Sequence, residues 1–200
     1  MLCYGSFLCV GEPKNHVKKT QIRYSEADEK KRENFKKTLA KVEKESPDKT
    51  VYYVDETGID KYLYRENVRA KRGVKVYSKI RGKKYERLSI VAGKSGDRIA
   101  APMVFSGTAD SVLFEHWFEK QFCPEIAGNI AVLDNATIHR KSKLFEIAQR
   151  YGVTLIFLPP YSPDLNKIEN FWARIKDTLR SVLPKFDNLM KAICYCFQLN

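Results

Sequence analysis

Three acidic residues that lie far apart in the chain each adjoin a segment with regular apolar patterning. Asp55 follows the β-rich run Val51–Val54, Asp134 follows the apolar run Asn129–Leu133, and Glu169 opens an amphipathic helical segment. Carboxylates brought together repel one another by about 4 kcal/mol at ~4 Å and an effective dielectric of 20, so a cluster of them needs a cation. Oxygen ligands suit Mg²⁺ or Mn²⁺. The residue types therefore predict a site for two such ions, which could drive in-line attack on a phosphate.

Simpler roles exist for two of these acids. Asp134 could turn the chain after a strand, because an Asp side chain can bond the backbone two residues on. Asn166 and Glu169 have the spacing of a capping box, with Asn166 as N-cap and Glu169 at the third helical position. Taken singly, each acid is compatible with a purely structural role. The case for chemistry depends on their convergence in the fold.

Neighbouring residues complete the candidate site. Strand alternation directs Glu56 to the face opposite Asp55, which predicts a structural or supporting role. His139 follows Asp134 by five positions, where it could orient a ligand, touch a phosphate, or only cap or pack. The chain has 3 His and no G-x-S-x-G motif, which argues against a serine hydrolase built on Ser162. No paired cysteine or histidine pattern indicates a structural zinc site.

The elements that must position these residues follow from periodicity and turn signals. Apolar residues at helical spacing, β-rich runs and a Lys94–Asp97 turn predict a mixed α/β sheet of five strands with helices on both faces. Strand 129–133, helix 141–151 and strand 153–158 follow one another, which predicts that the two strands pair in parallel through a right-handed crossover. The predicted helices are 25–45, 112–118 running on to Pro124, 141–151, 168–182 and 183–200; the predicted strands are 51–54, 87–92, 98–105, 129–133 and 153–158.

Composition narrows the classes of partner that the chain could bind. The formal charge is +12, with 36 Lys and Arg against 24 Asp and Glu, which favours a polyanion: DNA, RNA or an anionic membrane surface. No run approaches the ~20 apolar residues of a membrane span, and the first residues make a poor signal peptide. Five cysteines form no even disulfide framework. We therefore expect a cytoplasmic protein with no membrane partner.

Three motifs, taken together, resemble a known family. Val54–Gly58 (VDETG), Leu133–His139 (LDNATIH) and Leu158–Trp172 (LPPYSPDLNKIENFW) are similar to the three catalytic blocks of mariner-related DDE transposases from bacterial insertion sequences. The 34 residues between Asp134 and Glu169 match the spacing of that branch. The resemblance covers roughly residues 18–197, and the third block is long and specific.

The resemblance implies a ribonuclease H-like fold and Mg²⁺-dependent cleavage of double-stranded DNA followed by strand transfer, at element ends and target. It makes Asp55, Asp134 and Glu169 the catalytic, metal-binding residues, with Asn135 and His139 as neighbours of open role. It also makes DNA contact reasonable for a basic stretch, and a homodimer and a bacterial, nucleoid-associated setting are expected. The basic residues are Arg69, Arg72, Lys79, Lys83 and Arg87.

Two features depart from that family. Lys167 stands where the family usually has Pro, at a helix position where Pro is favourable but not required. Family members also carry an N-terminal helix-turn-helix region, and nothing precedes Lys18 here except a short leader, so we expect a truncated copy or one half of a split product. The expected organisation is a leader (1–17), a linker helix (18–50), a catalytic domain (51–183) and a C-terminal helical tail (184–200).

Two alternatives remain open on the sequence. The chain could be a non-catalytic DNA-binding or dimerising remnant of a transposase, although all three acids are present. An RNA-binding protein would rest on charge alone, because no RNP or KH signature is found. Only the enzyme requires a divalent metal.

Overall fold

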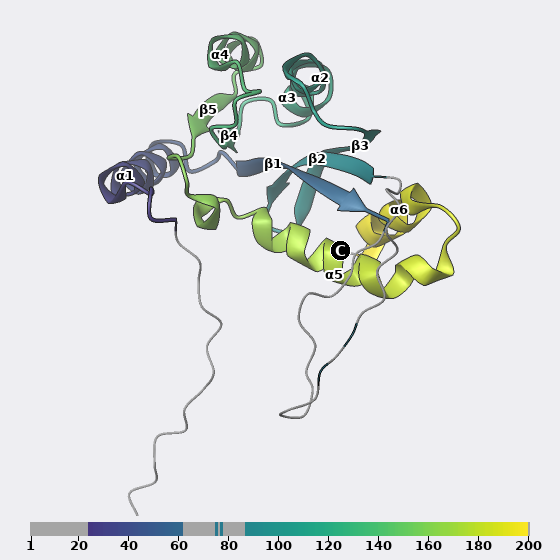
Figure 1. The fold of residues 1–200 in the computed structure, drawn as a ribbon. Coiled ribbons are helices and arrows are strands. Elements are labelled where there is room, and N and C mark those ends of the chain that lie inside the picture. Colours follow the sequence, from purple (N-terminus) through teal and green to yellow (C-terminus); the bar gives the residue numbers. More distant parts are fainter. Residues whose placement is uncertain (1–23, 62–74, 76, 78–86, 200) are drawn as a thin grey trace, which may run out of the picture.

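A five-stranded mixed sheet forms the centre of the fold. The computed structural model describes residues 24–61, 75, 77 and 87–199 (Figure 1). The strands are β1 (Val51–Asp60), β2 (Arg87–Ser95), β3 (Arg98–Ser106), β4 (Ile130–Leu133) and β5 (Thr154–Phe157). They lie in the order β3-β2-β1-β4-β5, with β1, β2 and β3 antiparallel and β1, β4 and β5 parallel. The predicted mixed sheet is confirmed.

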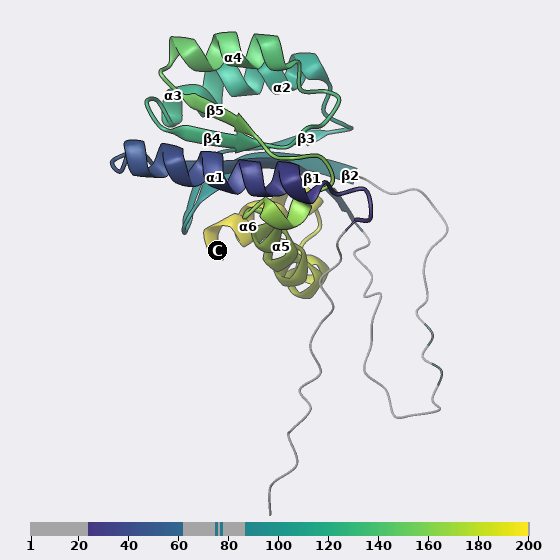
Figure 2. The same ribbon diagram turned by 90° about the vertical axis from the view of Figure 1, so that its left-hand side faces the viewer.

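Helices cover both faces of this sheet, as Figure 2 shows. On one face α1, α5 and α6 bury their apolar residues against the sheet, and on the other face α2, η1, α3 and α4 do so. The helices are α1 (Glu29–Glu45), α2 (Ser111–Trp117), the π-helical turn η1 (Phe118–Phe122), α3 (Cys123–Glu125), α4 (Lys141–Arg150), the short turn η2 (Pro163–Leu165), α5 (Glu169–Val182), the short turn η3 (Leu183–Lys185) and α6 (Leu189–Leu199).

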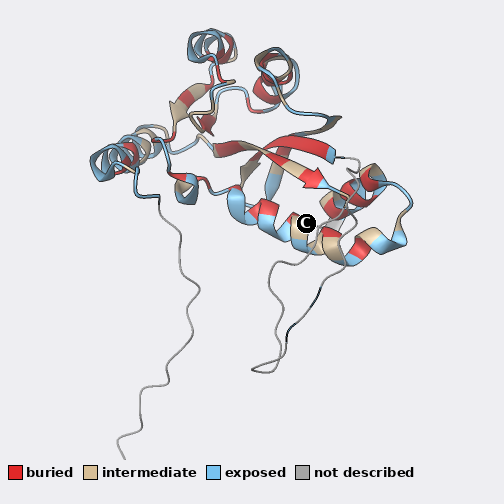
Figure 3. Cartoon of the chain, in the orientation of Figure 1, coloured by how far each residue is buried: buried red, intermediate tan, exposed pale blue. Residues whose placement is uncertain are grey.

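Burial follows the two layers. All four residues of β4 are buried, as expected for a parallel strand covered on both faces, and the outer faces of the helices are exposed (Figure 3). Successive residues of β1 alternate between the two cores: Tyr53 packs with the α5 side, and Tyr52 and Val54 pack with the α2 side. In the part of the chain described, no helix is both long and apolar enough to cross a membrane.

Two predicted boundaries are wrong. β1 does not end before Thr57 and Gly58, because its ladder with β2 continues through both to Asp60. The helical segment after Gly107 does not stop at Pro124, since Pro124 lies in the first turn of α3, where a missing backbone N–H costs nothing. Asp55 is therefore inside a strand rather than at its end.

The N-terminal helix α1 packs on the sheet by one edge. Asp28 caps it, with its side chain accepting hydrogen bonds from the backbone N–H groups of Lys30 and Lys31. Phe35 lies in the same core as α5 and α6. Arg32 is buried as well, which the apolar pattern of the helix does not predict.

Candidate active site

The parallel pairing of β1 with β4 brings two of the acids level with each other. Val51 pairs with Ile130 and Tyr53 with Val132, so the same register carried two residues further sets Asp55 opposite Asp134. Alternation from Tyr53 and Val132, which both pack on the α5 side, directs the two carboxylates to that same side. Strand register thus juxtaposes residues 79 positions apart in sequence.

Glu169 reaches the same place from the start of α5. It is the first residue of that helix, the preceding Ile168 occupies the N-cap position, and no side chain caps the helix. The capping-box interpretation of Asn166 and Glu169 is therefore wrong. Asn166 is buried and its Nδ2 instead donates to the carbonyl oxygen of Val54 at 3.3 Å, which leaves the Glu169 carboxylate available to the cleft.

The three acids line one cleft of about 500 Å³. Its other walls come from Tyr24, from the segment after β4, and from the loop between β5 and α5. Among the described residues that line this cleft there is no Lys or Arg. The described walls of the cleft therefore bring three acids together without a Lys or Arg beside them.

The electrostatics of Asp55 reflect that concentration. Burial, followed by the charges of Glu169, Glu56 and Asp134, raises the pKa of Asp55 to about 8. Trp172 Nε1 donates a hydrogen bond to Asp55 Oδ2 at 3.1 Å. Burial is also the main cause that raises the pKa of Glu169. Strongly perturbed carboxyl pKa values in a cleft are typical of functional sites.

Asp134 differs from the other two acids, because its pKa is lowered. Although burial acts to raise the pKa of Asp134, the hydrogen bond from His139 and the backbone N–H of Ala136 outweigh it and hold that pKa below its usual value. The distances are 3.1 Å from His139 Nδ1 and 3.0 Å from the Ala136 nitrogen to Asp134 Oδ1. The hydrogen bond from Ala136 is the turn interaction that the sequence suggested for Asp134. Asp134 makes this bond and also lines the cleft.

His139 links two carboxylates from different strands. Its Nδ1 contacts Asp134, its Nε2 lies 3.3 Å from Glu56 Oε1, and its ring packs 4.3 Å from the ring of Phe114, centroid to centroid. Burial alone would lower the pKa of His139, but the two carboxylates raise it to about 9. Glu56 thus points to the α2 side, as alternation predicts, and contacts His139 there.

Asn135 ties the ends of the two parallel strands together. Its Nδ2 donates to the carbonyl oxygen of Leu158, which follows β5. This bond fixes the chain immediately after Asp134. The sequence leaves the role of Asn135 open, and this contact fits a role in holding the shape of the cleft.

The carboxylate oxygens of the cleft are donors of the type that a hard divalent cation prefers, but their arrangement does not enclose an ion. Within the described residues, no group of three His, Cys, Asp or Glu side chains is arranged closely enough to hold a metal ion. The acids that line the cleft nevertheless offer oxygen donors, the ligand type that Mg²⁺ and Mn²⁺ prefer.

Of the predicted DNA-binding residues, the structure describes only Arg87, which is not among the residues that line this cleft. Arg69, Arg72, Lys79 and Lys83 fall outside the described residues. Arg87 is described: it begins β2, is largely exposed, and lies 3.9 Å from Asp60 Oδ1 through its Nε.

Two further residues at the site were not predicted from the sequence. Trp172 is a buried residue of α5, and its indole N–H donates a hydrogen bond to Asp55. Its position three residues after Glu169, nearly one helical turn, is the signal that could have indicated this. Tyr161, at the cleft, adopts a positive φ of 55°, which nothing in its sequence context indicates.

A family model described as DDE superfamily endonuclease matches residues 50–191. The chain therefore belongs to the DDE superfamily endonuclease family. A relative from Sinorhizobium fredii, the uncharacterized protein y4pE/y4sA, is 34% identical over 67 residues, which is 32% of this chain and 47% of that protein. The chain thus spans about half the length of the curated relative it matches.

Solved structures share the fold. A Mos1 transposase paired-end complex with the left transposon end has a TM-score of 0.59 at 15% identity, covering 83% of this chain and 54% of that one. A Mos1 transposase catalytic domain with raltegravir and Mg has a TM-score of 0.54 at 13% identity, covering 84% of this chain and 80% of that one. At these identities the likeness concerns the fold, which is ribonuclease H-like, as the resemblance implied.

Proposed function

We propose that this chain is the catalytic domain of a transposase, which cleaves and joins DNA strands with the help of divalent metal ions. The observation that carries the proposal is the convergence of Asp55, Asp134 and Glu169, from three separate elements, on one cleft without basic residues among its described walls. The solved relatives include Mos1 complexes with transposon ends and with Mg or Mn.

In this proposal Asp55, Asp134 and Glu169 hold two Mg²⁺ or Mn²⁺ ions. When bound, such ions supply the charge that activates an attacking water or 3′-hydroxyl and stabilises the leaving oxygen. Asp134 is ready as an ionised ligand, because His139 and the Ala136 N–H favour its charged form. Asp55 must lose its proton on binding, with the Trp172 indole N–H holding Oδ2 in place.

His139 and Glu56 support the ligands from behind. A protonated His139 between two carboxylates fixes the rotamer of Asp134 without entering the cleft. Double-stranded DNA is the proposed partner, held by the chain's excess of basic residues, and a homodimer acting in the bacterial cytoplasm is the proposed assembly.

Strand cleavage of supercoiled plasmid tests the proposal. The wild-type chain should nick DNA with Mg²⁺ or Mn²⁺ but not with EDTA, and Asp134→Asn should lose more activity than the roughly 10–100-fold that loss of a supporting residue costs. Glu146→Gln, at an exposed acid of α4, is the matched control and should nick normally. A folded wild-type chain that binds DNA but never nicks it would instead be a non-catalytic remnant.

A further inference from the structure

Arg32 is an unusual residue for the surface helix α1. Most of that helix is charged and exposed, yet the side chain of Arg32 is only 2% exposed. Arginine is seldom buried to this extent unless a specific partner compensates its charge. The partner of Arg32 therefore indicates which contact the burial of this side chain serves.

That partner is Asp164, 132 residues further along the chain. Arg32 Nη1 donates to Asp164 Oδ1 at 2.9 Å and Nη2 donates to Oδ2 at 2.7 Å. Two parallel hydrogen bonds of this kind fix the orientation of the carboxylate as well as its position. Glu29 Oε2, 3.5 Å from Arg32 Nε, holds the guanidinium from the helix side.

Asp164 lies in the part of the chain that builds the cleft wall. It belongs to η2, in the loop between β5 and α5, which follows the cleft residues Pro159–Pro163 and leads through Asn166 to Glu169. In Figures 1 and 2 this loop passes beside α1. The other side of the loop is held by Asn166, whose Nδ2 bonds the carbonyl of Val54, next to Asp55.

A second contact joins the same two segments. The ring of Tyr24, just before α1, lies 6.2 Å from the ring of Tyr161, centroid to centroid, and both residues line the cleft. Tyr161 has a left-handed backbone conformation (φ 55°), which a non-glycine residue keeps only where its surroundings enforce it. The start of α1 therefore braces the loop at two points.

We propose that Arg32 is a positioning residue: its paired hydrogen bonds to Asp164 set the loop before α5, and thereby the place of Glu169 relative to Asp55 and Asp134. The proposal rests on the proposed function, because positioning matters here for cation binding. Arg32 lies outside residues 50–191 matched by the family model, so α1 becomes part of the machinery of the site rather than only a linker.

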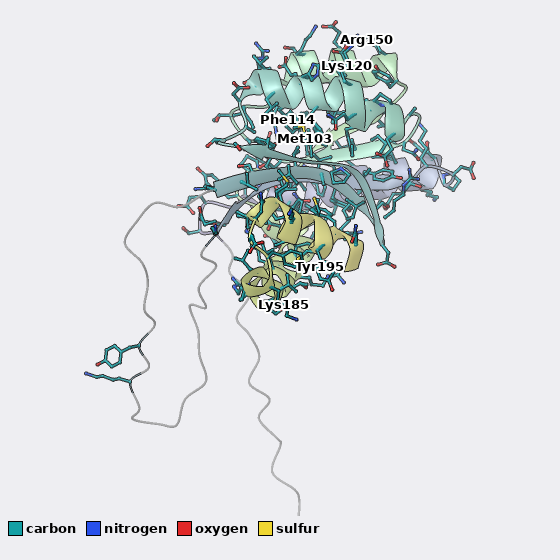
Figure 4. The ribbon with its side chains drawn as sticks, turned by 90° about the vertical axis from the view of Figure 1, so that its right-hand side faces the viewer. Met103, Phe114, Lys120, Arg150, Lys185 and Tyr195 are labelled. Atoms are coloured by element: carbon teal, nitrogen blue, oxygen red, sulfur yellow. The ribbon has the colours of Figure 1, made fainter. Side chains whose placement is uncertain are left out.

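The test compares Arg32→Lys and Asp164→Asn with a matched control. Arg32→Lys keeps the charge and loses the forked pair of hydrogen bonds, and Asp164→Asn loses the charge with little change in shape. Arg150→Lys is the control, because Arg150 Nη1 pairs with Glu119 at 2.6 Å on the helical layer of the opposite sheet face (Figure 4). Each protein is titrated with Mn²⁺ by calorimetry in the absence of DNA, and its melting temperature is recorded.

Mn²⁺ affinity should fall about tenfold or more in Arg32→Lys and Asp164→Asn, and stay within about twofold in Arg150→Lys. A general loss of stability cannot produce this pattern in variants that remain folded at the titration temperature. Wild-type Mn²⁺ affinity in both cleft-loop variants would overturn the proposal.

A metal-free readout separates this proposal from the proposed function. The indole N–H of Trp172 bonds Asp55 and lies one turn from Glu169, whereas that of Trp117 bonds the carbonyl of Ala101. In ¹⁵N NMR spectra, Arg32→Lys should shift the Trp172 indole signal and leave that of Trp117 in place. If the wild type bound no Mn²⁺, the proposed function would fail, and the Trp172 signal would still decide the role of Arg32: a shift supports it and an unmoved signal overturns it.

Discussion

Among the three acids of the cleft, Asp55 has the most strongly raised pKa. Its pKa is raised to about 8 by burial and by three neighbouring carboxyl groups, and its folded-state pKa therefore lies above that of the unfolded chain. The stability linked to this group is fully present below about pH 4 and is lost as pH rises towards about 8. Metal-free protein should accordingly become less stable as Asp55 ionises.

Asp55→Asn should remove that loss. At pH 8.5, without metal, we expect the variant to exceed the wild type in free energy of unfolding by on the order of 5 kcal/mol, and at pH 4 to differ little. Urea denaturation at the two pH values measures this. Asp60→Asn, at an exposed acid of the same strand, should show no such pH dependence. A variant less stable than the wild type at pH 8.5 would contradict the electrostatic description of the site.

Trp172 should tune Asp55 through its indole N–H. Trp172→Phe keeps an aromatic ring in the core and removes a donor that favours the ionised carboxylate, so the pH at half-maximal nicking should move upwards. Trp117→Phe removes a comparable donor, which bonds the carbonyl of Ala101 at 2.8 Å away from the cleft, and should leave the profile where it is. An equal shift in both variants would mean that the pH at half-maximal nicking responds to a general loss of packing and not to the bond with Asp55.

At the scale of elements, the sequence predicts the strands, their order of parallel and antiparallel pairing, and the site at the end of β4. It predicts these because hydrophobic periodicity and the crossover rule constrain them. It does not predict that β1 runs through Gly58. The sequence alone does not distinguish a glycine that ends a strand from one that stays in the strand because the neighbouring strand pairs with it. Asn166 similarly looks like a cap, and only the packed fold gives it Val54 as a partner.

Long-range side-chain pairs explain most of what the sequence leaves undetermined. The Arg32–Asp164 and His139–Glu56 contacts join residues 132 and 83 positions apart, and no local pattern encodes them. The three acids could be grouped because each adjoins an element with its own periodicity.

The contact between β2 and η1 provides a test at this scale. A Cβ atom at Gly93 would lie 2.2 Å from Phe122 Cε2, which is fully buried, so Gly93→Ala should destabilise the fold by about 1–3 kcal/mol. Gly58→Ala in the adjacent strand would meet only the exposed side chain of Arg87, which can move. Thermal melting of both variants measures the difference. A Gly93→Ala variant as stable as Gly58→Ala would show that β2 and η1 do not pack this closely.

At the scale of the whole molecule, charge should govern the proposed contact with DNA. The chain has a formal charge of +12, whereas the described walls of the cleft include no basic residue, so phosphate contacts should lie mainly outside the cleft. Binding to duplex DNA should then show little sequence preference and weaken steeply with salt, log K falling by roughly 0.9 per phosphate neutralised. Titrations with element-end and scrambled duplexes at two salt concentrations measure both. Strong preference for the element end at the higher salt would mean that this chain reads bases directly.

Titration of the metal-free protein with Mn²⁺, in the absence of DNA, tests most directly the claim that three carboxylates form one cation site. Asp55→Asn, Asp134→Asn and Glu169→Gln should each weaken Mn²⁺ binding by more than about tenfold, because each removes one ligand of the same ions. Glu146→Gln should bind as the wild type does. Unchanged Mn²⁺ affinity in an Asp55→Asn, Asp134→Asn double variant that remains folded would place the metal elsewhere and contradict the account.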